Sequence, residues 1–377
     1  MATIGKDLDY ACELLMEGEV IGLPTETVYG LAGDATREIA IERIYAVKKR
    51  PATNPLIVHV AGSDHLAGIV SSIPENALKL MDWFWPGPLT FLLPKAPTVH
   101  HAITAGQPRV AVRMPAHPLA LELLRNLPFP LAAPSANPYG YISPTTVQHV
   151  NDQLGSRIKY ILDGGPSSKG IESTIIGFDD TMPIIYRKGV ITDLDIQAII
   201  GKVKYFESKG IKGELLNEEI KGNNLQIFID SEEKVTSHIT SGMSLSHYAP
   251  KTPLYLLPDL GHKDVIQNSV NFNVLMEQMQ IYETLESQLK YKIKEKTARI
   301  GIISLKHLYF SQNICENLPI CQIQLSPVGD LKEAASNLYG ALHQLDQLEL
   351  DVIFAECMPE EGIGSAINDR LGRAAVR

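Results

Sequence analysis

The strongest constraint on the fold is an alternation of short apolar runs with amphipathic helical patterns between Val20 and about Ile200. This alternation is typical of an α/β domain, in which helices pack on a largely buried sheet. We expect strands at 20–23, 56–60, 89–93, 110–113, 131–133, 160–162, 174–176 and 184–186. We expect helices at 8–16, 39–48, 75–84, 119–125, 147–154 and 194–200. The pattern therefore predicts a first domain over residues 1–206.

The chain changes character after residue 206. Residues 207–253 are rich in Gly, Lys, Glu and Ser, which predicts a long linker or lid, and its Met243, Leu245 and Tyr248 favour docking over disorder. A second α/β pattern occupies residues 254–377, with strands expected at 254–257, 300–304 and 351–355. Helices are expected at 272–294, at 331–345 and from about 367. The strand, helix, strand order predicts a smaller, Rossmann-like parallel sheet.

Composition excludes several classes of protein. With 45% hydrophobic and 20% charged residues, the 377-residue chain has the balance of folded domains. A net charge of −9 argues against a protein that coats nucleic acid. An acidic start and the lack of a membrane-length apolar run predict a cytoplasmic protein with no membrane partner. The four cysteines show no C-x-x-C pair, so we expect core or incidental thiols, with Cys12 on an apolar helix face.

Three polar residues follow the first predicted strand, within Leu23-Pro-Thr-Glu-Thr-Val-Tyr-Gly-Leu31. In open α/β sheets, ligands bind beyond the carboxyl ends of strands, so Thr25, Glu26 and Thr27 would project into a crevice. A capped turn explains the same residues equally well, because Thr and Gly are common in loops.

Cationic residues end the second predicted helix, in Lys48-Lys-Arg-Pro-Ala-Thr-Asn-Pro55. Complementing the helix dipole is a sufficient structural reason for Lys48. Arg50, however, precedes a stiff loop containing Asn54, which would hold a guanidinium for bidentate phosphate binding. In the next strand, Leu56, Val58 and Val60 share one face and Ile57 and His59 the other. His59 is equally well explained as a buried strand residue or as a ligand.

Further polar groups follow later strands. Arg113 ends the strand at 110–113, and residues 134–144, which include Ser135, Asn137 and Ser143, expose backbone N–H groups that could cradle phosphates. Ser173 begins one strand and Arg187 ends another. Surface charge would explain Arg187 alone. Several arginines at strand ends with hydroxyls between them are more typical of an anion pocket.

Six short motifs in a fixed order carry a family resemblance. They are Pro24-Thr-Glu-Thr-Val-Tyr-Gly30, Lys48-x-Arg50, Pro86-Gly-Pro-Leu-Thr90, Val110-Ala-Val-Arg-Met-Pro115, Pro134-Ser-Ala-Asn137 and Ser173-Thr174. In this order they resemble the YrdC-like proteins, over about residues 8–200. With His247-Tyr-Ala-Pro250 and the trailing α/β unit, the whole chain is similar to the two-domain threonylcarbamoyl-AMP synthases.

The resemblance implies a fold and a reaction. The fold would be a twisted, open mixed sheet with helices, followed by a long linker and the smaller parallel α/β domain. The enzyme would be a nucleotidyltransferase that joins L-threonine, bicarbonate and ATP into threonylcarbamoyl-AMP, releasing pyrophosphate. Its cofactor would be Mg²⁺ with ATP, and a separate transferase would pass the product to an adenosine beside the tRNA anticodon, so we expect weak or no direct tRNA binding here.

The resemblance also assigns residues, although it names no magnesium ligand. Threonine would be held by Thr27, His59, Arg113, Ala133 and Ser173. ATP would be held by Arg50, Asn54, Ser135, Ser143, Arg187 and, from the linker, Tyr248. The catalytic set would be Lys48, Arg50, Ser135 and Asn137.

The chain departs from the family pattern in the linker, where Ser241 and Ser246 replace a common proline and a common basic residue. The assignment of pocket residues therefore does not by itself imply that the linker contacts ATP. Two alternative functions follow from the same fold: an RNA-binding module, and a carbamoyl-transferring domain of the hydrogenase-maturation type. The acidic charge balance opposes the first. The second occurs in larger chains with zinc-finger and acylphosphatase motifs, which this sequence lacks.

Overall fold

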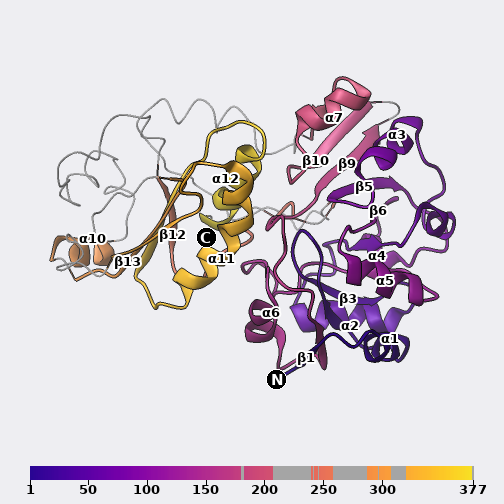
Figure 1. Cartoon of the computed structure of the whole chain (residues 1–377), viewed down its shortest axis with the longest axis horizontal. Helices are drawn as coiled ribbons and strands as arrows, with labels where there is room; N and C mark the ends of the chain where they lie inside the picture. Colours follow the sequence, from indigo (N-terminus) through magenta and orange to yellow (C-terminus); the bar gives the residue numbers. More distant parts are fainter. Residues whose placement is uncertain are drawn as a thin grey trace.

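The computed structural model describes residues 1–179, 182–206, 239–240, 242–244, 246–257, 287–295, 297–306 and 320–375. These residues form a large unit and a smaller unit (Figure 1). Most of the predicted linker, including Leu245 and Ser241, and the first part of the helix predicted at 272–294 lie outside the described residues. The domain boundaries at residues 206 and 253 accordingly stay predictions.

In the large unit, the described strands form one mixed sheet in the order β1-β8-β2-β3-β7-β4-β6-β5-β9-β10-β11. The strands are β1 (Thr3–Gly5), β2 (Ile21–Leu23), β3 (Gly30–Asp34), β4 (Ile57–His59), β5 (Leu89–Pro94), β6 (Arg109–Arg113), β7 (Leu131–Ala132), β8 (Tyr160–Leu162), β9 (Thr174–Asp179), β10 (Met182–Arg187) and β11 (Lys204–Tyr205). Because β4 and β6 are parallel and β9 runs opposite to both, the ends of β4 and β6 and the start of β9 share one edge.

Helices cover both faces of this sheet. They are α1 (Leu8–Met16), α2 (Glu38–Lys48), the 3₁₀ helix η1 (Ser63–Gly68), α3 (Glu75–Phe84), α4 (His101–Thr104), α5 (Pro118–Asn126), α6 (Val147–Leu154) and α7 (Asp193–Ile200). Helices α1 and α5 pack together on one face, where Cys12 is buried as predicted. Helices α2, α3, α6 and α7 contribute to the larger core on the opposite face.

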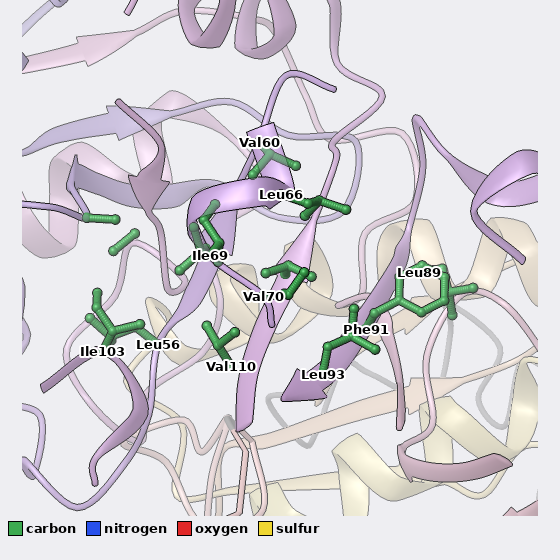
Figure 2. Close-up of a cluster of buried hydrophobic side chains, with 14 of the residues drawn as sticks. Leu56, Val60, Leu66, Ile69, Val70, Leu89, Phe91, Leu93, Ile103 and Val110 are labelled. Atoms are coloured by element: carbon green, nitrogen blue, oxygen red, sulfur yellow. The ribbon is translucent and has the colours of Figure 1, made fainter. Parts of the chain in front are cut away.

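The larger core follows the two-residue period of the strands. Figure 2 shows Leu56 and Val60, which flank β4, among its buried side chains. Val58 belongs to the same cluster, whereas Ile57 lies in a separate cluster on the other face. The predicted division of this strand into two faces is thus confirmed, and it turns His59 away from the core.

The smaller unit contains a sheet that is parallel throughout, as predicted. Its four described strands lie in the order β12-β15-β13-β14. Its strands are β12 (Leu254–Leu257), β13 (Ile300–Ser304), β14 (Ile320–Gln324) and β15 (Val352–Glu356). Its described helices are α10 (Ser287–Lys294), α11 (Leu331–Asp346) and α12 (Gly364–Ala375). None of the helices in the described part of the chain combines the length and hydropathy needed to cross a membrane.

The two units meet through α11 and α12, which lie between the small sheet and the large unit in Figure 1. One apolar cluster spans the boundary and joins Ile142 and Ile171 to the buried faces of both helices. Gly170 has φ +72°, and a methyl group there would lie 2.4 Å from the Cα of Ser336 on α11. The two backbones can therefore approach only because residue 170 has no side chain.

Candidate active site

A cavity opens at the edge of the large sheet where β4 and β6 end and β9 begins. The predicted site residues that line it are Thr27, His59, Arg113, Ala133, Ser135, Ser173, Arg187 and Tyr248. Lys48, Arg50, Asn54, Asn137 and Ser143 are not among its lining residues. The predicted site therefore divides into groups that face the cavity and groups that lie behind it.

The segment after β2 is both a capped turn and a wall of the cavity. Oγ1 of Thr25 accepts hydrogen bonds from the backbone N–H groups of Thr27 and Val28, each at 3.3 Å. Thr25 and Thr27 nevertheless line the cavity, and their hydroxyl oxygens are 2.8 Å apart. The two interpretations of this segment are thus compatible.

A buried ion pair holds Arg113 in place. Its Nη2 donates to Oε1 of Glu26 at 2.5 Å, its Nη1 to Oγ1 of Thr27 at 2.8 Å, and its Nε to the Gly87 carbonyl at 3.2 Å. The second oxygen of Glu26, Oε2, is buried without a hydrogen-bond partner. This fixed guanidinium can offer a positive charge to an anionic group in the cavity.

His59 faces the same space as a neutral imidazole. Burial, and then the neighbouring charge of Arg113, lowers its pKa to about 3. Its Nδ1 lies 3.3 Å from the Ile57 carbonyl, which can only accept, so Nδ1 carries the proton and Nε2 is the acceptor. His59 can therefore accept a hydrogen bond from an amine or hydroxyl of a ligand.

Ser173 lies between two strands that both contact it. Its hydroxyl is 2.7 Å from Oγ1 of Thr90 on β5. Arg187, the last residue of β10, donates from Nη2 to the Ser173 carbonyl at 2.8 Å and to the Ser173 hydroxyl at 3.1 Å. Thr90 belongs to a motif recognised in the sequence, but its pairing with Ser173 depends on the alignment of β5 with β9 and could not be read from the chain.

Lys48 lies behind the cavity and connects two motifs. Its Nζ donates to the backbone carbonyls of Ser135 and Asn137, each at 2.5 Å. Asn137 in turn donates from Nδ2 to the carbonyls of Pro138 and Tyr141. The Lys-x-Arg and Ser-x-Asn motifs are thereby brought together, with Lys48 fixing the backbone that carries Ser135.

Arg50 is buried in the loop after α2. Its Nη2 donates to Oδ1 of Asn54 at 2.5 Å and to the Pro55 carbonyl at 2.8 Å. Burial lowers its pKa to about 10, and the charge of Arg187 adds to that effect. Burial also lowers the pKa of Lys48, and the charge of Arg50 contributes. Buried cations that lower one another's pKa in this way would all be stabilised in their charged form by an anion bound among them.

The linker forms one wall of the cavity. His247 and Tyr248 both line it, and Tyr248 is 2% exposed, so the predicted docking of this residue is confirmed. Ser244 holds the segment on both sides, because its hydroxyl is 2.6 Å from the Tyr139 hydroxyl and its carbonyl accepts from Nη1 of Arg373 at 2.6 Å. Gly242, with φ +80°, lies where a methyl group would come within 2.8 Å of the Tyr248 hydroxyl.

Glu172 is a lining residue that the sequence interpretation did not single out. Its carboxylate accepts from the hydroxyl of Ser143 at 2.7 Å, from that of Tyr339 at 2.9 Å, and from Nε of Arg370 at 2.7 Å. The contact of Ser143 is therefore with this carboxylate. A glutamate inside the otherwise apolar and hydroxyl-bearing run at 171–176 is the signal that could have identified it.

The described residues do not form a protein metal centre. They contain no group of three His, Cys, Asp or Glu side chains that could hold a metal ion. The cavity is instead surrounded by arginines and hydroxyls, including Arg113, Arg187 and Ser173. This donor set suits an anionic ligand.

Two family profiles cover nearly the whole chain. The profile Sua5_yciO_yrdC, described as Telomere recombination, matches residues 13–189. The profile Sua5_C, described as Threonylcarbamoyl-AMP synthase, C-terminal domain, matches residues 192–376. Their order is the one expected from the motifs.

Two relatives match over nearly their full length. The threonylcarbamoyl-AMP synthase of Bacillus subtilis is 36% identical and covers 100% of this chain and 94% of its own length. That of Pyrococcus abyssi is 34% identical, covering 97% and 93%. The crystal structure of P. abyssi Sua5 complexed with L-threonine superposes with a TM-score of 0.78 at 32% identity, covering 100% of this chain and 97% of that one. The chain therefore belongs to the threonylcarbamoyl-AMP synthase family.

Proposed function

We propose that the protein is an L-threonylcarbamoyladenylate synthase, which converts L-threonine, bicarbonate and ATP into threonylcarbamoyl-AMP and pyrophosphate. The observation that carries the proposal is that Thr27, His59, Arg113 and Ser173 line one cavity together with Arg187. The full-length relatives of that name and the similarity to a structure holding L-threonine support it. In reaction class the enzyme is a nucleotidyltransferase that transfers an adenylyl group.

Threonine binds at the end of the cavity formed by the large unit. Arg113, held by Glu26, neutralises its carboxylate, while Thr27 and Ser173 offer hydroxyls. Nε2 of His59 accepts a hydrogen bond from the substrate amine or hydroxyl. Ala133 presents its backbone in the same wall. This orientation leaves the amine, once deprotonated, free to attack bicarbonate.

The chemistry needs positioning and charge neutralisation more than a protein nucleophile. The amine attacks the carbon of bicarbonate, water leaves, and a carbamate forms. A carbamate oxygen then attacks the α-phosphorus of ATP, and the bond to pyrophosphate breaks. Because carbamate loses CO₂ readily, shielding of the cavity from water by the buried Tyr248 would favour the second step over decomposition.

ATP binds beside Arg187, which lines the cavity, and toward Arg50, which does not line it. Both arginines neutralise the phosphates, and Ser135, whose backbone Lys48 fixes, contacts them from the cavity lining. For Asn54 and Ser143 we propose indirect roles, since Asn54 orients Arg50 and Ser143 donates to Glu172. Magnesium would enter with ATP as part of the substrate and would help to neutralise the phosphate charge.

The product would serve tRNA modification through a separate threonylcarbamoyl transferase, and this chain itself would have weak or no affinity for tRNA. Since that chemistry acts on tRNA, we place the enzyme in the cytoplasm. The net charge of −9 supports transfer of a small molecule in preference to stable binding of RNA.

The test is pyrophosphate release by the purified protein with MgATP, omitting threonine or bicarbonate in turn, with the nucleotide product identified by mass. Release that requires both substrates and yields the mass of threonylcarbamoyl-AMP would support the proposal. Absence of release, accompanied by salt-sensitive tRNA binding, would replace it with the RNA-binding alternative.

A further inference from the structure

The guanidinium of Arg370 crosses the boundary between the units. It belongs to α12, is 1% exposed, and donates from Nε to Oε2 of Glu172 at 2.7 Å. Its Nη2 donates to the Lys188 carbonyl at 2.8 Å and its Nη1 to Oδ2 of Asp369 at 2.6 Å. The Tyr248 ring centroid lies 5.2 Å from its Cζ. One side chain of the smaller unit thus contacts both the large unit and the linker.

The two contacts in the large unit flank the site. Glu172 lines the cavity and directly precedes Ser173, while Lys188 directly follows Arg187. Between them, Arg187 donates to the Ser173 carbonyl and hydroxyl. Arg370 therefore fastens the chain on both sides of the Ser173–Arg187 contact without lining the cavity itself.

The ion pair with Arg370 also favours the ionised form of Glu172. Burial alone would raise the pKa of this carboxyl, but the charges of Arg370 and then Arg187 outweigh burial and lower it. The carboxylate therefore depends on two cations. If Arg370 is removed, Arg187 is the remaining arginine that stabilises it, and a buried carboxylate attracts such a cation strongly because leaving it unpaired is costly.

We propose that Arg370 is a positioning residue of the active site: by pairing with Glu172 it keeps Arg187 on Ser173 and directed to the nucleotide. This inference rests on the proposed function, because it names the site that Arg187 serves. It assigns the smaller unit a specific task in catalysis, which is to neutralise one carboxylate beside the cavity. Ser143 and Tyr339, as neutral donors, complete the set around that carboxylate without supplying charge.

The test combines three variants, Arg370→Met, Glu172→Gln and the double variant, assayed for pyrophosphate release with ATP and threonine varied separately. In Arg370→Met, we expect KM for ATP to rise at least about tenfold, with a smaller change for threonine. The double variant should recover to within about threefold of Glu172→Gln, because no unpaired carboxylate remains to draw Arg187 away. Equal loss in the single and double variants would overturn the inference, since it would mean that Arg370 acts only by holding the units together.

Arg299→Met is the matched control. Arg299 lies in the same unit, is half exposed, and donates to the Leu348 carbonyl, far in sequence from α12. Its loss should leave both KM values unchanged.

Thermal unfolding of each variant and the dissociation constant for ATP are measured in parallel. If the parent protein binds ATP but makes no threonylcarbamoyl-AMP, the proposed function fails, while the ATP affinities still decide whether Glu172→Gln rescues Arg370→Met. An unchanged ATP affinity in Arg370→Met would also overturn the inference.

Discussion

The two units use their buried arginines differently. In the large unit, Arg113 pairs with Glu26 of the same unit. In the smaller unit, Arg370 pairs with Glu172 of its neighbour. Under the proposed function, the threonine site would thus be complete within the large unit, whereas the nucleotide site would depend on Arg370 of the smaller unit as well. This difference predicts that substitutions will separate threonine use from ATP use.

The largest effect should come from Arg113→Met, which removes the partner of a buried carboxylate. Because Glu26 would be left uncompensated, we expect a loss of about 3–5 kcal/mol of folding stability. Threonine-dependent pyrophosphate release should disappear at the same time. Chemical denaturation and the assay test this. Arg113→Met together with Glu26→Gln should regain stability without activity, and recovery of activity as well would show that Arg113 does not contact the substrate.

Arg50→Ala should weaken the use of ATP more than the binding of threonine. The substitution removes charge-assisted hydrogen bonds of a kind that contributes about 1.5–3 kcal/mol, so KM for ATP should rise about 10- to 100-fold. Threonine binding should change far less, because Arg113 and His59 are intact. Isothermal titration with each substrate distinguishes the two. Equal loss of both affinities in a folded variant would contradict the assignment of Arg50 to phosphate.

Lowering the pH should destabilise the boundary between the units at His343. This residue of α11 stacks on His149 of α6, with ring centroids 4.0 Å apart. Burial, and then the charge of His149, lowers the pKa of His343 to about 3. In the unfolded chain histidine titrates near 6.5, so the unfolded state binds the proton first as pH falls. Stability is therefore full above about pH 6.5 and is lost progressively toward pH 3.

At pH 5, His343 is expected to lower the free energy of unfolding by about 2 kcal/mol, which would be measured as a lower unfolding temperature. His343→Gln, compared with the parent between pH 7 and pH 5, should flatten this dependence. His59, whose pKa is also about 3, contributes the same slope from within the large unit, so part of the effect should remain. An unaltered slope in His343→Gln would mean that this histidine is not buried in its neutral form.

The smallest effect is expected for Thr90→Val, which preserves shape and removes the hydroxyl beside Ser173. One neutral hydrogen bond contributes about 0.5–1.5 kcal/mol, so KM for threonine should rise about 2- to 10-fold. KM for ATP should stay constant, because Arg187 contacts Ser173 from the other side. Steady-state kinetics with each substrate varied separately checks this, and a larger effect on ATP would show that the Ser173 hydroxyl serves the nucleotide.

Most of the fold could be predicted from periodicity. Each strand and helix expected before residue 206 is present, with ends shifted by at most three residues. Among the described residues, the elements that were missed are β1, β3, β11, β14, α4 and η1. In β3 (Gly30–Asp34) the residues are small, with two glycines, so the usual strand signal is weak although all five are buried. The short edge strands β1 and β11 have too few residues to show a period.

The candidate site was predicted less completely, because local sequence patterns do not specify which distant residues contact each other in the folded chain. Motifs identified the hydroxyls and arginines, but not that Glu26 would bind Arg113 or that Thr90 would meet Ser173. Arg370 gave a usable signal, since it falls on the apolar stripe of α12 with Ile367, Leu371 and Ala374. A lone arginine on a buried helix face predicts a partner carboxylate in the neighbouring unit.

The contact at Gly170 has a consequence for how sequences of this kind can vary. The spacing between the two units is set there by main chain against main chain, at a position with φ +72°. No substitution on α11 can relieve a side chain introduced at residue 170, because the obstacle is backbone and not a neighbouring rotamer. A single added methyl group would act as a wedge that separates the units while leaving every group in the cavity chemically intact.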